Sequence, residues 1–261
     1  MAIWAGHYYS FSLKSDSPPV ASHELVRRMS PLQRALLGAM ETFSRHEGEA
    51  FKYVIKDSNF PIYFATSLGE LDANLKVTDA LRDSSIPLSP TAFQNSVHNA
   101  APGCLAIIYG IHSPSLTFSS GYASPDRVLL LAQQHLDLGL HDCICIAAGN
   151  ENYPKEAEEA AFAELFVLFS DKACGPLTRS LQLLNTVHKS ATSCQQGDVN
   201  VTEVDFQIYQ EPVSLGGENQ SRFSTLFGTC PEKLLAGRQH RRVVQELDGD
   251  RFESCWKQAQ I

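Results

Sequence analysis

The segment "HSPSLTFSSGYASPDRVLLLAQQHLDLGLHDCICIAAGNE", residues 112–151, decides the fold. Residues 114–121 are predicted to form a strand, residues 125–139 a helix that ends at Gly139, and residues 141–151 a fully apolar buried strand. Strands with continuous apolar runs that alternate with helices are typical of a sheet covered on both faces. The segment therefore predicts an α/β layered architecture.

The residues upstream and downstream continue this alternation. Residues 27–48 carry apolar side chains at spacings of three and four, the mark of an amphipathic helix, with Ser30 as its N-cap and Pro31 at its first position. Further strands are predicted at 1–12, 60–67 and 160–171, the last as one strand or a pair. Further helices are predicted at 69–83 and at 95–111, the second interrupted by Pro102 and Gly103. Residues 86–93 are predicted to form a loop because of their prolines.

The composition of the sequence changes from Ala191 onward. Two stretches there are polar and Gly-rich, and residues 201–210 between them alternate like a half-exposed strand. The final part of the chain, which includes the basic run 237–244, is charged and is predicted to be helical. We expect residues 1–190 to form the compact domain and residues 191–261 to form a less regular C-terminal extension.

The composition limits the class of protein. The chain has 261 residues, is 43% apolar and carries a net charge of -8, which supports a real core and argues against nucleic acid or an anionic membrane as the main partner. No stretch approaches the roughly 20 uninterrupted apolar residues that span a bilayer. The N-terminus also lacks the pattern of a signal peptide. We therefore expect a soluble cytoplasmic protein.

The seven cysteines include no C-x-x-C pair, and an odd number in a chain of this length fits a reducing compartment. Cys143 and Cys145 alternate with isoleucine, so both are expected on the same face of a buried strand. No His or further Cys lies at ligand spacing, and we interpret the two as core thiols rather than ligands. The sequence predicts neither a metal site nor a cofactor.

The residues "SSGYASPD", 119–126, have the outline of a strand-turn-helix elbow, on which many α/β enzymes carry a nucleophile. Gly121 would tolerate the positive φ of the turn, and the free N–H groups of the following helix would stabilise an anion at the apex. The apex residue is Tyr122, whose phenol, with a pKa of about 10, is a weak acyl acceptor. Ser124 could be a nucleophile instead, although "GYASP" departs from the G-x-S-x-G pattern. His98 is a candidate base or a structural hydrogen bonder.

The ordered series of motifs resembles the N-terminal half of a β-ketoacyl-ACP synthase of the thiolase fold. That family runs from an Asn-Ala-Ala-x-Gly helix through a Gly-Pro-Ser strand to an Ala-Cys-Ser-Ser elbow, and then to a strand ending in Gly-Gly-x-Glu. The resemblance covers about residues 1–170. The matching residues in this chain are Asn99, Ala100, Ala101 and Gly103, then Pro114 and Ser115, and finally Gly149 and Glu151.

Two departures from the family pattern bear on function. The acylated cysteine of the family falls on Tyr122, and the family's two histidine loops are not found after residue 170. The resemblance therefore implies that the chain does not catalyse decarboxylative condensation alone. It is similar instead to the short chain length factor subunits of type II ketosynthases in aryl polyene pigment clusters.

That resemblance implies a heterodimer or higher heteromer with a catalytic ketosynthase subunit, which elongates polyene or fatty acyl chains on an acyl carrier protein with malonyl units. The strand of Leu116, Thr117, Phe118 and Ser119 would pair with its equivalent across the interface. Tyr122 would fill the empty nucleophile pocket, and residues 191–261 would replace surface given by the missing second half. The expected tunnel or gating residues are Phe93, Gln94, Ser96 and Val97, with core packing as the alternative for Phe93 and Val97.

Two other functions stay open at this point. The chain could be a stand-alone acyltransferase or hydrolase that uses Ser124 or Cys104, although burial in an apolar helix is expected to raise the pKa of that thiol. It could also be a homodimeric acyl-binding scaffold. Neither nucleic acid nor a membrane is expected as a partner.

Overall fold

The chain folds into a mixed sheet with helices on both faces. The computed structural model describes residues 2–6, 8–14, 24–56, 60–121, 124–152, 159–170, 181–189, 239–245 and 251–258. The strands are β1 (Ile3–Ala5), β2 (Tyr9–Lys14), β3 (Ile62–Thr66), β4 (Ser115–Ser119), β5 (Cys143–Glu151), β6 (Glu159–Ser170), β7 (Leu181–Lys189), β8 (Gln239–Gln245) and β9 (Arg251–Gln258). The helices are the 3-10 helix η1 (Glu24–Arg28), α1 (Pro31–Glu47), α2 (Glu49–Lys56), α3 (Leu71–Arg82), α4 (Pro90–Asn95), α5 (Ala100–Tyr109) and α6 (Ser124–Asp137).

All nine described strands belong to one sheet. Their order is β4-β3-β5-β6-β1-β7-β9-β8, and β2 pairs with β6 beside this path. β3 runs parallel to both β4 and β5, whereas the other pairs are antiparallel. The parallel strands therefore lie together at one end of the sheet, and β4 is the strand at that edge.

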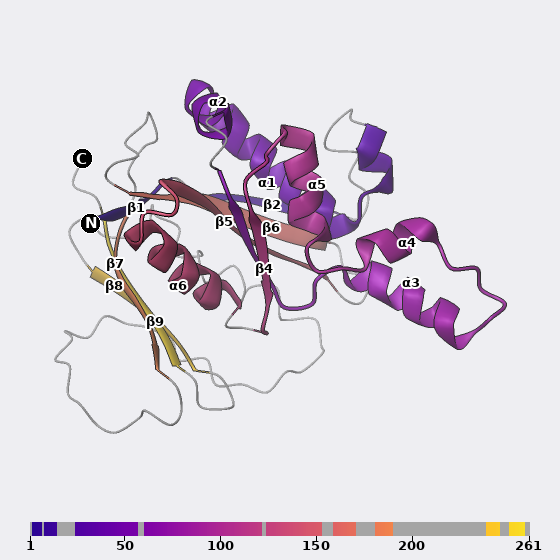
Figure 1. The fold of residues 1–261 in the computed structure, drawn as a ribbon. Helices are drawn as coiled ribbons and strands as arrows, with labels where there is room; N and C mark the ends of the chain where they lie inside the picture. Colours follow the sequence, from indigo (N-terminus) through magenta and orange to yellow (C-terminus); the bar gives the residue numbers. More distant parts are fainter. Residues whose placement is uncertain are drawn as a thin grey trace.

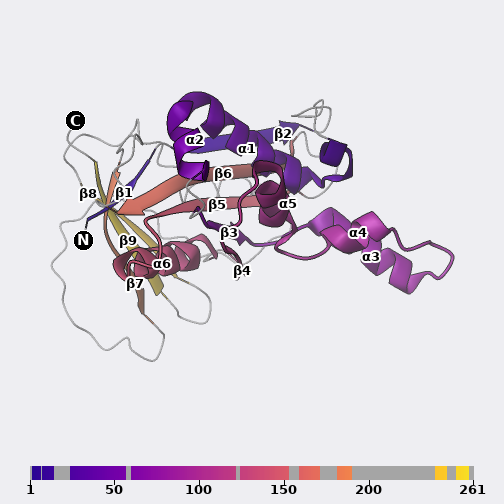
Figure 2. The same cartoon turned by 45° about the horizontal axis from the view of Figure 1, so that its top comes forward.

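Side chains of the central strands alternate between two cores. Phe64, Cys145 and Val167 pack on the face covered by α1, α2 and α5, whereas Ile146 and Phe166 pack on the opposite face against α6. Figures 1 and 2 show these helices on the two sides of the sheet. Alternate residues of a strand point to opposite faces of the sheet, so a strand with helices packed on both faces needs a continuous run of apolar residues. The predicted α/β layered architecture is confirmed.

The cysteines of β5 follow this alternation. Cys145 is fully buried in the core beside α1, and Cys143 packs against the same core. The prediction that both lie on one face is thus confirmed, and burial raises the pKa of the Cys145 thiol. Such a thiol behaves as a small apolar side chain.

α1 begins as the sequence predicts. Ser30 caps the helix by accepting a hydrogen bond from the Gln33 backbone N–H at 3.1 Å, and the Gln33 side chain accepts in return from the Ser30 N–H. Pro31 occupies the first helical position. A backbone N–H there has no acceptor within the helix, so proline, which lacks the N–H, costs the helix no hydrogen bond. The apolar stripe that includes Leu36 and Phe43 is buried against the sheet.

Three predictions of secondary structure are wrong. The predicted loop 86–93 contains the start of α4, because Ser89 caps it by accepting a bond from the Ala92 N–H. The helix predicted over 95–111 begins only at Ala100, and Pro102 fits inside it because the first turn needs no N–H donor. The charged final part forms strands β8 and β9 rather than a helix, because β9 pairs with β7 and β8 pairs with β9, and this pairing overrides the propensity of the charged residues.

Two further differences are smaller. The predicted opening strand is divided into β1 and β2, and α2 is a helix that the sequence analysis does not predict. The half-exposed strand expected at 201–210 lies outside the described residues. Where the structure describes a helix, none has the length and hydropathy needed to cross a membrane.

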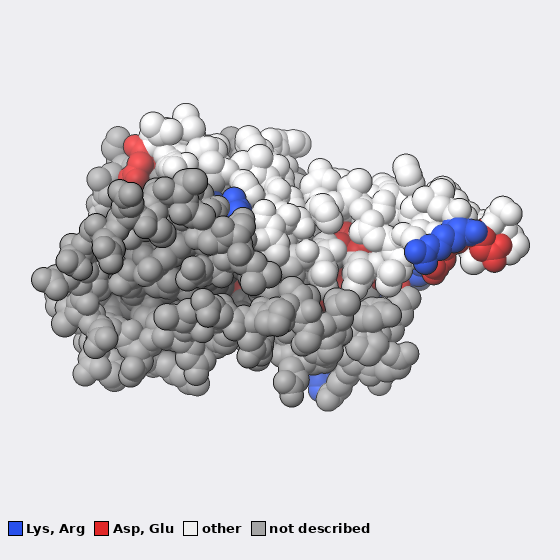
Figure 3. Space-filling model, turned by 90° about the horizontal axis from the view of Figure 1, so that it is seen from below, with Lys and Arg blue, Asp and Glu red and all other residues white. Residues whose placement is uncertain are grey.

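α3 and α4 form an arm that projects away from the sheet (Figures 1 and 2). Basic and acidic side chains lie side by side along this arm in the space-filling view (Figure 3). Large apolar side chains are exposed on it as well, namely Leu81, Ile86, Leu88, Phe93 and Val97. An arm with exposed apolar residues is typical of a surface that contacts another molecule.

Candidate functional site

The candidate site lies where the parallel strands β3, β4 and β5 end. Their carboxyl ends lie side by side, and residues from the turns that follow them are linked by hydrogen bonds. Ligands of open α/β sheets bind outside the carboxyl ends of such strands. The site has four parts: the elbow after β4, the turn after β3, a buried pair of carboxyl groups and the base of the arm.

The elbow after β4 is held by the buried hydroxyl of Ser124. Its Oγ accepts a hydrogen bond from the Ser120 N–H at 2.7 Å and lies 2.9 Å from the Thr66 carbonyl oxygen and 2.7 Å from the Gly121 carbonyl oxygen. Gly121 has φ of 60°, as the predicted turn requires. The Ser124 hydroxyl therefore fixes the turn and is not presented to a substrate. The apex residue, Tyr122, lies outside the described residues.

The turn after β3 is organised by Asn150 at the end of β5. The buried Asn150 Oδ1 accepts hydrogen bonds from Thr66 Oγ1 at 2.9 Å and from the backbone N–H groups of Ser67 and Leu68 at 2.9 and 3.2 Å. Thr66 Oγ1 in turn accepts from the Gly69 N–H at 2.9 Å. One side chain thus satisfies three donors at the end of a strand, which fixes the backbone there.

His98 packs directly on this turn. A Cβ added to Gly69, whose φ is 62°, would lie only 2.3 Å from His98 Nδ1. The positive φ favours glycine at this position, and a larger residue would also have to displace the His98 ring. His98 is exposed, in the turn that precedes α5.

A pair of carboxyl groups is buried beside the turn. Glu70 Oε1 accepts a hydrogen bond from Gln33 Nε2 at 3.1 Å, and Glu151 accepts from the backbone N–H groups of Leu32 and Asp72. Burial, strengthened by the neighbouring Glu151, raises the pKa of Glu70 to about 8. Burial also raises the pKa of Glu151. At neutral pH the pair therefore keeps a proton and joins the start of α1 to the start of α3.

The sequence reasoning missed most of this network. Glu151 was matched to the family's strand ending, but Asn150 beside it and Glu70 were not singled out. A polar residue at the end of an otherwise apolar strand was the available signal for Asn150. Glu70 gave no such signal, because a charged residue at a helix start is ordinarily exposed.

Cys104 lies half-buried in α5. Burial raises the pKa of its thiol to about 11, and the charge of Glu70 contributes. The predicted direction is confirmed. At neutral pH nearly all of this cysteine is the unreactive thiol rather than the thiolate.

The predicted tunnel residues lie together on the arm. Phe93 and Gln94 are in α4, Ser96 follows as its C-cap, and its hydroxyl donates to the Phe93 carbonyl at 2.8 Å. The Phe93 side chain is 61% exposed and Val97 is 52% exposed. Neither therefore packs in the core of this chain, and both are available to another molecule.

The predicted interface strand, β4, lies at the edge of the sheet. Leu116, Thr117 and Phe118 are half-buried and Ser119 is exposed. Within the described part of the chain β4 pairs with β3 alone. Its sequence, "SLTFS", carries no charge and no proline, the usual means by which edge strands avoid pairing.

No group of three or more His, Cys, Asp or Glu side chains that could hold a metal ion is found among the described residues. The polar groups at the strand ends are instead occupied with one another. The geometry of this region thus holds the ends of strands and the base of the arm in place.

The comparisons with known proteins agree with this fold. Residues 4–164 match the family described as "Beta-ketoacyl synthase, N-terminal domain". No protein of curated function matches the sequence.

Among solved structures, the chain is similar to one from the complex of the ketosynthase ApeO with its chain length factor ApeC from Xenorhabdus doucetiae. The identity is 17% and the TM-score 0.60, over 98% of this chain and 99% of that chain. The ishigamide ketosynthase/chain length factor gives 11% identity and a TM-score of 0.71 over 100% of both chains. The AntDE:AntF complex, described as a type II PKS acyl-carrier protein in complex with its ketosynthase, gives 12% and 0.70 over 99% of both chains.

At these identities the solved structures establish the fold, which is the thiolase-like fold expected from the motif series. The family match shows membership of the family as well as the fold, because it covers residues 4–164, more than half of the sequence. The protein belongs to the family of β-ketoacyl synthase N-terminal domains.

Proposed function

We propose that the protein is a chain length factor, a non-catalytic subunit that pairs with a catalytic ketosynthase and shapes the tunnel for the growing acyl chain. The observation that carries the proposal is Tyr122, which stands at the elbow where the family places its acylated cysteine. A phenol, with a pKa of about 10, is a far weaker acyl acceptor than a thiolate at neutral pH. A ketosynthase domain without its nucleophile is suited to support a partner's active site.

The partner in this proposal is a catalytic ketosynthase, joined through β4. The edge of β4 is uncharged and unpaired within the described residues, and a two-fold or pseudo-two-fold axis would bring an equivalent strand beside it. The similar solved structures named as ketosynthase and chain length factor complexes support a ketosynthase as the partner. The Leu116 to Ser119 strand would then be buried.

The arm supplies the tunnel residues in this proposal. Phe93 and Val97 are exposed on a projecting helix pair, where they can line a cavity of the partner and stop a growing chain by their bulk. Gln94 and Ser96 would contribute polar groups beside them. Tyr122 would fill the pocket of the missing thiol, and residues 191–261 would cover surface given elsewhere by a second thiolase half.

The reaction of the complex is the extension of an acyl chain on an acyl carrier protein with malonyl units, as in aryl polyene biosynthesis. The partner ketosynthase holds the acyl group, and this chain limits its length. The AntDE:AntF structure, which is named as containing a carrier protein with its ketosynthase, supports the carrier protein as the source of the substrate.

The test is to mix the purified protein with the ketosynthase encoded beside it and to measure molar mass by light scattering after gel filtration. A stable heterodimer or heterotetramer is expected, and the mixture should elongate an acyl chain that neither protein elongates alone. Two monomers at micromolar concentration would overturn the proposal.

The second candidate, an acyltransferase or hydrolase using Ser124 or Cys104, is tested by intact mass spectrometry after incubation with acyl carrier protein substrate. The buried, hydrogen-bonded Ser124 hydroxyl and the raised pKa of Cys104 both argue against an adduct. An acyl group found on this chain, and lost in Cys104→Ala or Ser124→Ala, would favour the enzyme.

A further inference from the structure

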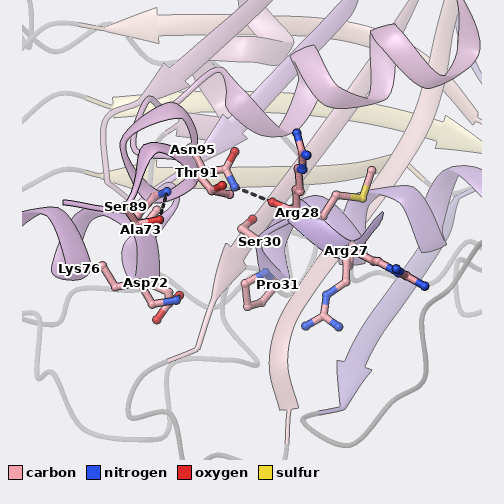
Figure 4. Close-up of a pocket in the computed structure, with 13 residues that line it drawn as sticks. Arg27, Arg28, Ser30, Pro31, Asp72, Ala73, Lys76, Ser89, Thr91 and Asn95 are labelled. Carbon is pink, nitrogen blue, oxygen red and sulfur yellow. Dashed lines mark hydrogen bonds and ion pairs between the residues drawn. The ribbon is translucent and has the colours of Figure 1, made fainter. Parts of the chain in front are cut away.

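The arm of α3 and α4 is attached to the body of the protein by few packed side chains. Ala73 is the buried residue of α3, and Ala92 is that of α4. A cleft of about 320 Å³ separates the arm from η1 and the start of α1, and Figure 4 shows the residues that line it. Helices with so few buried apolar contacts are among the least stable parts of a fold. The arm therefore depends on polar contacts at its base.

Polar contacts at the base join each helix of the arm to the body. On α4, Asn95 Nδ2 donates a hydrogen bond to the last carbonyl oxygen of η1 at 2.9 Å, drawn as a dashed line in Figure 4. At the start of α3, Glu70 Oε1 accepts from Gln33 Nε2 of α1 at 3.1 Å. The Asp72 backbone N–H donates to Glu151 Oε2 of β5 at 2.6 Å. The two contacts of α3 both involve the buried carboxyl pair, so this pair carries the attachment of that helix.

The two carboxyl groups of the pair hold one proton between them. Glu70 is 0% exposed and Glu151 is 4% exposed, and the hydrogen bond between their carboxyl groups runs from a protonated Glu70 to an ionised Glu151. Glu70 Oε2 receives no hydrogen bond from a described residue, as expected of the oxygen that carries the proton. Burial, together with the charge of Glu151, raises the pKa of Glu70 from 4.5 to about 8, although the side chains of Ser30 and Gln33 act to lower it.

The titratable groups that face the pair belong to α3, to α5 and to the turn before α5. The Asp72 carboxylate acts with burial to raise the pKa of Glu151, and it is itself paired with Lys76 Nζ at 2.6 Å. The Cys104 thiol is neutral, because burial raises its pKa to about 11. His98 lies against the turn that leads into α3. Among the described residues no cation shifts either pKa of the pair, so a second negative charge there would not be neutralised.

We propose that Glu70 and Glu151, which share one proton, form a pH-sensitive latch that holds the arm against the body. When the arm opens, Glu70 reaches solvent and returns to its ordinary pKa. Between pH 4.5 and 8, opening therefore releases a proton, and the latch weakens as the pH rises. Above about pH 8 the closed pair has already lost the proton, and the dependence on pH ends. One proton changes the opening equilibrium about ten-fold per pH unit.

The latch bears on function through the exposed side chains of the arm. This step rests on the proposed function, in which Phe93 and Val97 of the arm line the acyl tunnel. Glu70 is then a positioning residue, because it acts through the position of α4, which packs on α3. A looser arm is expected to broaden the distribution of chain lengths that the complex makes as the pH rises.

The experiment is hydrogen–deuterium exchange of the full-length chain, without its ketosynthase, read by mass spectrometry at several pH values from 5 to 9. Labelling times are scaled so that unprotected amides exchange equally at each pH. In the wild type, α3 and α4 should be less protected than β5, because the arm opens without unfolding of the body. Their protection should fall by about ten-fold per pH unit up to pH 8 and then level off.

Glu70→Gln is the diagnostic variant. Glutamine keeps the acceptor for Gln33, and its amide can donate to Glu151 as the protonated carboxyl does, but it cannot ionise. The arm should then lose the contribution of Glu70 to the pH dependence and be better protected than the wild-type arm at pH 9. The matched control, Asp79→Asn, removes an exposed carboxylate from α3 and should follow the wild type.

A wild-type arm whose protection does not change with pH, or a Glu70→Gln arm with the wild-type slope, would overturn the latch. Equal protection of α3 and β5 in the wild type would also overturn it, because the arm would then open only when the whole protein unfolds. The exchange experiment needs no partner, whereas the chain length factor role is tested by assembly with the ketosynthase. Each proposal can therefore fail without the other.

Discussion

The hydroxyl of Ser124 lies 2.9 Å from the backbone carbonyl oxygen of Thr66 and so joins the first residue of α6 to the last residue of β3. The Ser124 Oγ also accepts a hydrogen bond from the Ser120 N–H on the other side of the elbow. The shape of the elbow is therefore maintained by a residue two positions after Tyr122. This explains how the turn can persist whichever residue occupies its apex.

Ser124→Ala should destabilise the fold by about 1–3 kcal/mol, because the half-buried N–H of Ser120 loses its acceptor and the buried hydroxyl is removed. Urea unfolding measures the change in the free energy of unfolding. Ser84→Ala, in an exposed turn, is the control and should change it by less than about 0.5 kcal/mol. Equal stability of the two variants would show that the hydroxyl does not hold the elbow.

Glu70→Gln should flatten the pH dependence of stability. The pKa of Glu70 is raised from 4.5 to about 8 by burial and by Glu151, so between these values the folded state keeps a proton that the unfolded state has lost. The free energy of unfolding of the wild type should then fall with rising pH, by up to about 1.4 kcal/mol per unit, and level off above pH 8.

Glutamine keeps the acceptor for Gln33 and cannot ionise, so the variant should lose the contribution of Glu70 to this slope, keep that of Glu151, and be the more stable protein above pH 8. Denaturant unfolding between pH 5 and 9 measures this. The control Glu49→Gln changes an exposed carboxylate and should follow the wild-type curve. Parallel curves for Glu70→Gln and the wild type would exclude Glu70 as the titrating group.

Phe93→Ala should lengthen the acyl product of the complex, because the change removes a bulky side chain from the proposed tunnel. Its stability should hardly change, since Phe93 is 61% exposed in the isolated chain. Mass spectrometry of the carrier-bound products gives the length distribution. Leu81→Ala, on α3 of the same arm and 78% exposed, is the control expected to leave that distribution unchanged. An unaltered product from Phe93→Ala would remove Phe93 from the tunnel.

Thr117→Lys should weaken assembly with the ketosynthase by about ten-fold or more, because it places a charge in the middle of the proposed paired edge. Biolayer interferometry with immobilised ketosynthase measures the dissociation constant. Leu140→Lys adds the same charge to an exposed apolar residue after α6 and should have little effect. Circular dichroism must show both variants folded, and equal affinities would place the interface elsewhere.

The elements β5, α6 and α1 could be predicted from the sequence because their signals are local. β5 is an uninterrupted apolar run, α6 has a periodic stripe closed by Gly139, and α1 has both a cap and a proline at its start. The strands β8 and β9 could not be predicted, because their conformation depends on the pairing of β9 with β7 and of β8 with β9, which local propensity does not report.

The candidate site could be predicted only in part, because some of its residues carry a local sequence signal and others do not. The positions of Phe93 and of β4 followed from a motif series that resembles a known family, and the structure places them on the exposed arm and at the sheet edge. The environment of Glu70 and the cleft between η1 and α3 depend on which segments meet in space. Arg27 and Lys76 are 49 positions apart in the sequence and line one cavity only because η1 and α3 converge.

The position of β1 in the sheet has a consequence for how the protein folds. β1 lies between β6 and β7, so the third residue of the chain pairs with Ser170 and Leu183. β9, which covers the other edge of β7, ends at residue 258. During synthesis at about 5–20 residues per second, β1 is made many seconds before β6 and β7, the strands with which it pairs. The high sequence separation of these pairs predicts slow final closure of the sheet and a need for protection of β1 until then.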